Sequence, residues 1–292
     1  MTATPIHPGA VLRALMQRRQ AVAMPGCHDA LGATLIEQAG FECTYMSGYC
    51  VAAAHGLPDI GLISGTQMVA RATEIIAATT LPVLVDADTG YGGVSNIAEA
   101  VRAFERAGAA GLHLEDQVSP KKCGAMAGKA LVSDEEMAQR VRAALAARRS
   151  PDFLIIARTD AAGMFGIDEA VRRLKVMEAL GVDAVMAPAL SSLDECRRAA
   201  EAVSIPVLHT VSETVRPVFP RSQLAGTGLG VAMYPISLLM AITGIQQRLL
   251  AELAATGDTL DCVSAMTPLP EISKLLGSQR FADFETAIAQ ES

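Results

Sequence analysis

The sequence lacks several features that would place it in particular classes of protein. Its net charge is −7 and its basic residues are scattered, so a nucleic-acid-binding role has little support. Its six cysteines form no C-x-x-C pair and match no zinc module, so we expect reduced thiols in a cytoplasmic protein. No apolar run has the length of a membrane span, and the first residues do not resemble a signal peptide.

What the sequence does contain is a regular alternation of short apolar segments with amphipathic ones. We expect eight strands, at residues 21–25, 42–47, 82–88, 110–115, 152–158, 182–187, 205–210 and 228–234, and helices that include 7–19, 97–107 and 167–180. Eight such units in one undivided chain favour a closed (β/α)₈ TIM barrel over an open sheet. We expect residues 1–292 to form a single barrel domain, with 236–292 as a C-terminal helical extension.

Two carboxylates follow the third apolar segment. Residues 83–85 are typical of a buried parallel strand and lead into Asp86, Asp88 and a glycine-rich turn. Because residues i and i+2 of a strand point the same way, we expect the two aspartates to leave this strand side by side. Two anions this close repel unless a cation or a shared proton relieves them. Mg²⁺, which takes carboxylate, water and substrate oxygens, is the simplest such cation.

Polar side chains also end the neighbouring strands. Active sites of such barrels lie at the carboxyl ends of the strands, so these residues should gather on one face. Ser47 and the amides around Gly48 can bind a carboxylate, or they can form an ordinary tight turn. The full set comprises Ser47, Gly48 and Tyr49 after the second strand, Glu115 and Asp116 after the fourth, and Arg158, Thr159 and Asp160 after the fifth.

Each of the charged residues has two interpretations. Asp86, Asp88 and Glu115 can surround Mg²⁺ directly or through waters, and the alternative is N-capping of the following helices. The planar fork of Arg158 suits a substrate carboxylate, and the alternative is a structural ion pair with one of the acids. A matched set of acids on neighbouring strands favours the metal.

Residues 117–133 form a long connection rich in Gly, Lys and small residues, typical either of a lid or of a surface excursion. Within it, Cys123 follows two lysines, whose charge lowers the pKa of a neighbouring thiol. Such a thiol is suited to proton transfer, but an incidental exposed thiol is the more usual interpretation of a single cysteine. We expect His113 to be a hydrogen-bonded core residue and His209 to be able to reach the site.

Several motifs together resemble the isocitrate lyase/phosphoenolpyruvate mutase superfamily, in particular its 2-methylisocitrate lyase-like branch. The resemblance spans residues 21–235 and implies a (β/α)₈ barrel that binds Mg²⁺ (with Mn²⁺ as an alternative) and an α-oxocarboxylate or its enolate. It also implies a homotetramer whose subunits exchange a C-terminal helix. The motifs are Leu57-Pro-Asp-Ile60, Asp86-Ala-Asp-Thr-Gly-Tyr-Gly92, Glu115-Asp-Gln117, Lys121-Lys-Cys-Gly124 and Ile156-Ala-Arg-Thr-Asp160.

The resemblance implies roles for named residues. Cys123, Arg158 and Asp59 would be catalytic, with Cys123 moving a proton under a loop that closes over the substrate. Asp59 would also join the three predicted metal ligands in organising the ion and its waters. The substrate-binding residues would be Ser47, Gly48, Tyr49, Gly124, Arg158, Thr210 and Glu213.

Three positions depart from the pattern of the lyases. Ala125 stands where they carry His, Pro188 lies where they carry Glu after the sixth strand, and Thr210 stands where they carry Asn. The residues that the resemblance assigns to the metal are therefore retained, whereas residues that would select the substrate differ from those of the lyases.

The leading hypothesis for function is a Mg²⁺-dependent carbon–carbon lyase that cleaves a 2-hydroxy di- or tricarboxylate to a 2-oxoacid through a metal-stabilised enolate. Oxaloacetate decarboxylation or hydrolysis is the first alternative, because it demands less of a pocket for a distal carboxylate. A phosphoenolpyruvate mutase-type enzyme and a non-catalytic oxoacid-binding barrel are the others. Besides its own subunits, we expect a small carboxylate as the partner, and neither nucleic acid nor a membrane.

Overall fold

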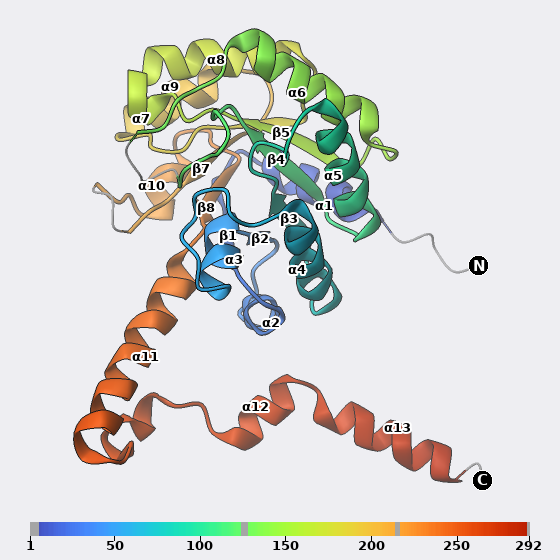
Figure 1. Ribbon diagram of the computed structural model, residues 1–292, viewed down its shortest axis with the longest axis vertical. Helices are drawn as coiled ribbons and strands as arrows, with labels where there is room; N and C mark the ends of the chain where they lie inside the picture. Colours follow the sequence, from blue (N-terminus) through green and yellow to red (C-terminus); the bar gives the residue numbers. More distant parts are fainter. Residues whose placement is uncertain (1–5, 124–127, 214–216, 291–292) are drawn as a thin grey trace. The chain divides into compact units, whose positions relative to one another are not determined.

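The computed structural model describes residues 6–123, 128–213 and 217–290. Eight parallel strands close into a barrel in the order β1 to β8 (Figure 1). The predicted (β/α)₈ barrel is therefore confirmed, and every predicted strand is present. The strands are β1 (Val22–Cys27), β2 (Thr44–Met46), β3 (Val83–Asp86), β4 (Gly111–Glu115), β5 (Leu154–Arg158), β6 (Ala184–Met186), β7 (Val207–Thr210) and β8 (Val231–Tyr234).

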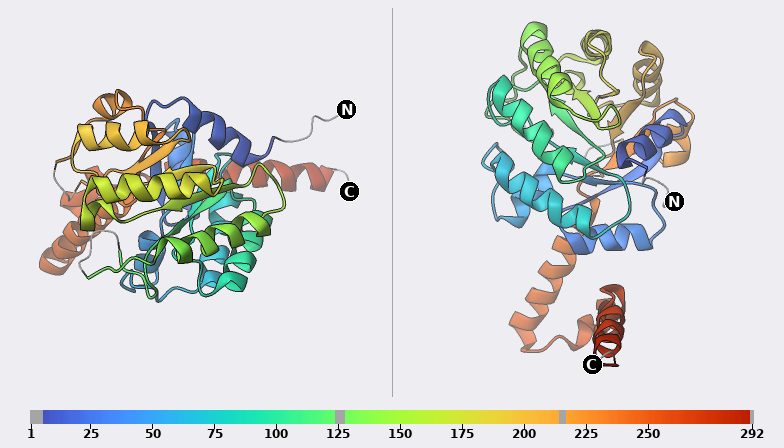
Figure 2. Two further views of the ribbon diagram at one scale, coloured as in Figure 1. Left: turned by 90° about the horizontal axis from the view of Figure 1, so that it is seen from above. Right: turned by 90° about the vertical axis from the view of Figure 1, so that its right-hand side faces the viewer.

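The helices between successive strands lie outside the barrel of strands (Figures 1 and 2). The helices predicted at 7–19, 97–107 and 167–180 are α1, α5 and α8, and Gly108 and Gly181 follow the last two with φ of +91° and +87°. The helices of the barrel are α1 (Pro8–Gln17), α2 (Ala30–Gln38), α3 (Gly48–Ala54), α4 (Gly65–Ala77), α5 (Val94–Arg106), α6 (Asp134–Ala147), α7 (Ala162–Phe165), α8 (Ile167–Ala179), α9 (Leu193–Ala202) and α10 (Arg221–Ala225).

Two separate hydrophobic clusters hold the barrel together. One combines strand residues such as Met24, Leu84 and Ile156 with Leu12 and Met16 of α1, so this helix packs on the core of the barrel. The other lies between the strands and the surrounding helices. Strands β2 to β6 are buried on both faces, so most of their residues are apolar without alternation in the sequence.

The contact of α1 with the barrel gives a prediction. A Cβ on Gly9 would lie 1.9 Å from the backbone oxygen of Asp152 and 2.5 Å from that of Ala110. We expect Gly9→Ala to lower the free energy of unfolding by about 1–3 kcal/mol, because the helix must move off the strands. Urea denaturation measures this, and Gly244→Ala is the matched control because a Cβ there meets nothing within 4 Å. Equal stability of the two variants would contradict the close contact.

The chain divides into two compact units, Met1–Leu239 and Met240–Ser292. Helix α11 (Ser237–Thr256) begins in the first unit, and η1 (Leu260–Ala265), α12 (Leu269–Leu275) and α13 (Ser278–Gln290) lie in the second. Within the described residues, most of the chain from 237 to 290 is helical. Across the described ranges, no helix is both long enough and apolar enough to cross a membrane.

Candidate active site

A cavity of about 190 Å³ lies at the carboxyl ends of the strands. The connections after β2 to β5 bring most of the predicted site residues to one side of it, as the barrel topology predicts. These lining residues are Ser47, Tyr49, Asp59, Asp86, Glu115, Cys123 and Arg158.

Asp86 is the last residue of β3, and its carboxylate is held by hydrogen bonds. Its Oδ2 accepts from the amide of Gly48 and from the hydroxyl of Tyr45, each at 3.1 Å, and its Oδ1 accepts from the amide of Asp88 at 3.0 Å. Burial opposes ionisation of this carboxyl, but the surrounding positive groups and the Asp88 amide outweigh it and lower its pKa. Asp86 is therefore an ionised, fixed acceptor.

Asp88 lies close to Asp86, as expected, but it is not part of the same strand. Strand β3 ends at Asp86, and Asp88 lies beyond it with a φ of +48°, so the prediction of a shared strand is wrong. The two carboxylates still converge, because a Cβ on Gly48 would lie 2.8 Å from Asp86 Oδ2 and 3.3 Å from Asp88 Oδ1. Burial and the neighbouring Asp86 raise the pKa of Asp88 to about 7.

Lys121 supplies a cation among these acids. Its Nζ hydrogen-bonds Asp59 and lies 2.8 Å from Asp88 Oδ1, and its side chain is only 6% exposed. Burial lowers the pKa of Lys121, but the charges of Asp88, Asp86, Asp59 and Glu115 outweigh it and raise the pKa. Sequence reasoning missed this role, because it treated Lys121 as a loop residue that acts on the thiol of Cys123. The Cys123 amide itself donates to the backbone oxygen of Asp59 at 3.1 Å.

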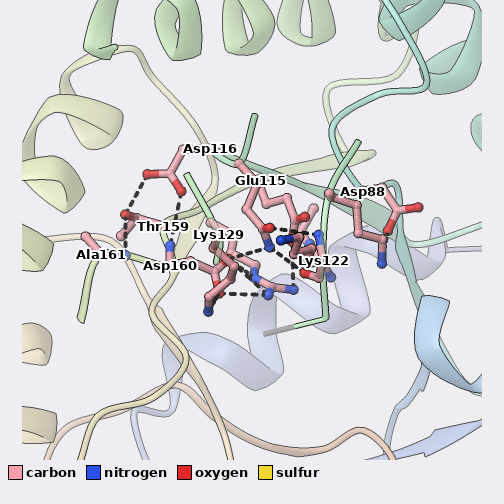
Figure 3. A network of polar contacts seen from close by, with 12 residues as sticks. Asp88, Glu115, Asp116, Lys122, Lys129, Thr159, Asp160 and Ala161 are labelled. Atoms are coloured by element: carbon pink, nitrogen blue, oxygen red, sulfur yellow. Dashed lines mark hydrogen bonds and ion pairs between the residues drawn. The ribbon is translucent and has the colours of Figure 1, made fainter. Parts of the chain in front are cut away.

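Arg158 forms the structural ion pairs that we considered as its alternative role. Its Nε and one terminal nitrogen donate to the two oxygens of Asp160 at 3.0 and 3.1 Å, and the other terminal nitrogen lies 3.1 Å from Glu115 Oε2. Asp160 is held in turn, since its amide donates to Asp116 and its carboxylate pairs with Lys129 at 3.1 Å. Figure 3 shows Asp116, Thr159 and Asp160 together on one side of Glu115.

The acids do not cap the helices that follow them. The N-cap of α5 is Gly93, and the N-cap of α6 is Ser133, whose hydroxyl accepts from the amide of Glu136 at 3.2 Å. The capping alternative for Asp86, Asp88 and Glu115 is therefore wrong. Asp86 and Glu115 line the cavity instead, and Asp88 lies 2.8 Å from the Lys121 ammonium.

The donor set fits a hard cation that is held partly through waters. Among the described residues, no three His, Cys, Asp or Glu side chains form a ready-made ligand group. Mg²⁺ needs only one or two carboxylates, since it keeps several waters. Glu115 Oε1 is buried without a hydrogen-bond partner in the described chain, and Asp88 Oδ1 faces the Lys121 ammonium without an aligned hydrogen bond. The predicted trio of Asp86, Asp88 and Glu115 stays a prediction.

The remaining predicted residues fall into three groups. Thr210 and His209 line the cavity, so the expectation that His209 can reach the site is confirmed. Glu213 is exposed, accepts a hydrogen bond from the Ser237 hydroxyl and is not among the lining residues. Gly124 and Ala125 lie outside the described residues.

His113 is a buried core residue, as predicted. One ring nitrogen, Nε2, lies 2.8 Å from the Tyr45 hydroxyl, and burial lowers the pKa of His113 to about 4. Sequence reasoning missed Tyr45, which connects this histidine to Asp86. The signal was available, because Tyr45 precedes Ser47 by two positions and therefore shares its side of the chain.

The thiols give a prediction about reactivity. Burial raises the pKa of Cys27 to about 11 and that of Cys43, Cys50 and Cys196 to about 12, whereas Cys123 and Cys262 are half-buried. We expect iodoacetamide at pH 8 to modify only Cys123 and Cys262, since thiolates are the reactive form. Mass spectrometry identifies the modified sites, and the urea-denatured protein is the control in which all six react. Rapid labelling of Cys196 in the native protein would contradict this assignment.

Comparison with known proteins identifies the family. The family model of phosphoenolpyruvate phosphomutase matches residues 12–254. The probable 2-methylisocitrate lyase 2 of Corynebacterium glutamicum is 40% identical, over 95% of this chain and 91% of that protein. The 2,3-dimethylmalate lyase of Eubacterium barkeri is 37% identical, over 96% of this chain and 98% of that protein.

Two solved structures of enzymes are also similar to this chain in fold. Oxaloacetate acetylhydrolase in complex with 3,3-difluorooxalacetate has a TM-score of 0.90 at 29% identity, over 98% of both chains. Phosphonopyruvate hydrolase in complex with oxalate and Mg²⁺ has a TM-score of 0.86 at 28% identity, over 96% of this chain and 99% of that one. The family model, the lyase relatives and the shared barrel together show that this chain belongs to the isocitrate lyase/phosphoenolpyruvate mutase superfamily of enzymes.

Proposed function

We propose that this protein is a Mg²⁺-dependent carbon–carbon lyase, which cleaves a 2-hydroxy di- or tricarboxylate into a 2-oxoacid and a second carboxylate. The observation that carries the proposal is one cavity lined by Asp59, Asp86, Glu115, Cys123 and Arg158. The lyase relatives support the reaction class, and the complex of phosphonopyruvate hydrolase with oxalate and Mg²⁺ supports the ion.

Each of the four acids would have a role in binding. Asp86 and Asp88 would hold the ion, and Glu115 and Asp59 would hold its waters. Bound there, Mg²⁺ would supply Lewis-acid stabilisation of the negative charge that develops on the substrate oxygens. Arg158 would contribute positive charge to the substrate carboxylate, and Ser47, Gly48 and Tyr49 would offer it hydroxyl and amide donors.

The proton steps fall to Asp59 and Cys123. Asp59, which lines the cavity, takes the proton of the 2-hydroxyl group. The bond between C2 and C3 then breaks, C2 becomes the carbonyl carbon, and the electron pair remains on C3. The Cys123 thiol gives its proton to C3, and the proton on Asp59 passes through solvent to restore the thiol. Water must be kept from C3 during this step, so that the carbanion is protonated by the thiol.

Product analysis tests the proposal directly. We expect purified protein with Mg²⁺ to release pyruvate or glyoxylate from a 2-hydroxy dicarboxylate, and to stop when EDTA is added. Calorimetry with oxalate, which resembles the enolate of a 2-oxoacid, should show binding that depends on Mg²⁺. Binding of oxalate without cleavage of any hydroxyacid would identify an oxoacid-binding barrel and exclude the lyase.

Oxaloacetate hydrolysis or decarboxylation is the second candidate. It is supported by the structural likeness to oxaloacetate acetylhydrolase. It is also supported by the described lining residues that follow β6, β7 and β8, among which there is no Asp, Glu, Lys or Arg. Release of oxalate and acetate from oxaloacetate would identify the hydrolase, whereas release of pyruvate and CO₂ would identify the decarboxylase.

We also propose a homotetramer in the cytoplasm. The C-terminal helices expose large apolar side chains, including Leu250, Leu269, Phe281 and Phe284, which are suited to subunit contacts. None of the six cysteines, all of which lie in the described residues, forms a disulfide, which is typical of a protein from a reducing compartment. Light scattering of the full chain would measure the number of subunits.

A further inference from the structure

Gln117 is a buried side chain next to the site, two positions after the end of β4, and it is 1% exposed. Its amide group forms two hydrogen bonds with the backbone of one residue, Lys122. The Gln117 Oε1 accepts from the Lys122 amide at 3.0 Å, and the Gln117 Nε2 donates to the Lys122 backbone oxygen at 2.8 Å. Because a backbone amide can only donate and a backbone oxygen can only accept, these partners fix the orientation of the Gln117 amide. One side chain thus holds both backbone groups of Lys122, as a neighbouring strand would.

These hydrogen bonds act on Cys123 through one peptide group. The backbone oxygen of Lys122 and the amide of Cys123 belong to the same planar unit and point in opposite directions. Gln117 bonds the oxygen, and the amide donates to the backbone oxygen of Asp59 at 3.1 Å. The peptide plane is therefore held at both ends and cannot rotate without the loss of a hydrogen bond. This restricts the direction in which the Cys123 side chain leaves the backbone.

Gln117 is itself attached to the end of β4. Its backbone oxygen accepts from a terminal nitrogen of Arg140 at 2.8 Å, and the same nitrogen donates to the backbone oxygen of Glu115 at 3.1 Å. Arg140 belongs to α6 and is buried. Gln117 also pairs with Leu131 in an isolated antiparallel bridge. The residue that holds Lys122 is therefore fixed relative to Glu115, one of the predicted metal ligands.

The local backbone around Cys123 is irregular. Residues 118–123 form neither a helix nor a strand, so the regular hydrogen bonds of such elements do not fix this thiol. Its placement depends instead on individual hydrogen bonds such as those of Gln117. Gln117 is not one of the described residues that line the cavity, so any effect on the reaction has to pass through a neighbour.

We propose that Gln117 is a positioning residue, which holds the peptide group between Lys122 and Cys123 so that the thiol is directed at C3 of the substrate. This inference rests on the proposed lyase function, because it concerns the proton transfer by Cys123. It assigns to Gln117 no contact with the substrate or with the ion. A proton donor that is displaced by about 1 Å can slow a reaction by up to about 100-fold, so such a hold matters for the rate.

Hydrogen exchange tests the hold on Cys123 without any substrate. In Gln117→Met, the Lys122 amide loses its acceptor directly, so the informative group is the Cys123 amide, which is bonded to Asp59. We expect it to exchange about tenfold faster, as when one or two hydrogen bonds no longer oppose local opening. Mass spectrometry with fragmentation to single amides measures this. The matched control is Gln139→Met, since Gln139 is exposed on α6 and should leave both amides unchanged. Unchanged exchange at Cys123 in Gln117→Met would overturn the inference.

Kinetics test whether the hold serves proton transfer. Gln117→Met should lower kcat by about 10–100-fold and leave the Mg²⁺-dependent binding of oxalate unchanged. In the Cys123→Ser background, the same substitution should lower kcat by less than about threefold, because the group through which Gln117 acts is already missing. A residue needed only for stability would not show this dependence on Cys123. Equal losses in the two backgrounds would overturn the inference.

A second variant guards against a failure to fold. Gln117→Asn keeps a buried amide but is one methylene group shorter, so it releases Lys122 with a smaller change in buried polarity. The same faster exchange and the same dependence on Cys123 are expected. Faster exchange at Cys123 with unchanged kcat would overturn the positioning role and leave the lyase function intact. A protein that cleaves no 2-hydroxyacid would overturn the proposed function and the catalytic role of Gln117 with it, and exchange would still decide whether Gln117 holds Cys123.

Discussion

Replacing Cys123 by Ser should lower kcat by about 10²–10⁴-fold, the usual contribution of a positioned proton donor. A hydroxyl has nearly the same size as a thiol but is a far weaker acid, so the carbanion at C3 would lack its proton. The binding of oxalate with Mg²⁺ should change little, because the acidic residues of the site are untouched. Steady-state kinetics and calorimetry on the same preparation separate the two effects.

The matched control for this experiment is Cys262→Ser in η1, since Cys262 is the other half-buried thiol. It should keep the kcat of the original protein. A Cys123→Ser enzyme with full turnover would remove this thiol from the mechanism, and another acid would have to be sought. Loss of oxalate binding in the same variant would mean that Cys123 supports the site rather than the proton transfer.

Replacing Arg158 by Met should lower the free energy of unfolding by about 3–5 kcal/mol, as for other buried ion pairs that lose one partner. The guanidinium bonds both oxygens of Asp160 and lies 3.1 Å from Glu115, and all three side chains are buried. Without it, two carboxylates would stay in the interior with less positive charge beside them. Urea denaturation measures the loss of stability.

Arg172→Met is the matched control, because it removes a similar set of ion pairs at an exposed position. Arg172 also bonds two acids, Asp134 and Glu169, but its side chain is 47% exposed. Water screens such pairs, so we expect this variant to lose no more than about 1 kcal/mol. Equal losses in the two variants would show that the ion pairs of Arg158 do not depend on their burial.

Arg158→Lys separates stability from catalysis. The ammonium keeps the positive charge between Glu115 and Asp160, so most of the stability should remain. It cannot reproduce the paired hydrogen bonds of the planar fork, so kcat/KM should fall. Unchanged kcat/KM in this variant would restrict Arg158 to a structural role.

The sequence allowed the barrel to be predicted because its signals are local and repeated. Each strand is a short apolar run, and each helix has its own periodicity, so an error at one element does not change the others. The placement of Ser47, Asp86, Glu115 and Arg158 around one cavity followed from topology, since parallel strands in a barrel end on the same face.

The parts that sequence reasoning missed depend on connections whose path is set by tertiary packing. Asp88 leaves the strand with a positive φ, which the i, i+2 pattern could not reveal. Lys121 is 33 positions from Asp88 in the sequence, and nothing in the motif shows that its ammonium folds back onto that carboxylate. The apolar residues that line the cavity, such as Leu190, Phe219 and Ile236, are divided among connections after three strands, so no single segment shows their pattern.

The position of Lys121 has a consequence for whether the protein needs a metal ion in order to fold. Many metal centres are clusters of like charge that hold together only once their ion arrives, so that folding waits for the metal. Here an ammonium of the chain itself already lies against Asp59 and Asp88. We therefore expect the barrel to fold without magnesium, so that a chelator stops the proposed reaction but leaves the free energy of unfolding unchanged.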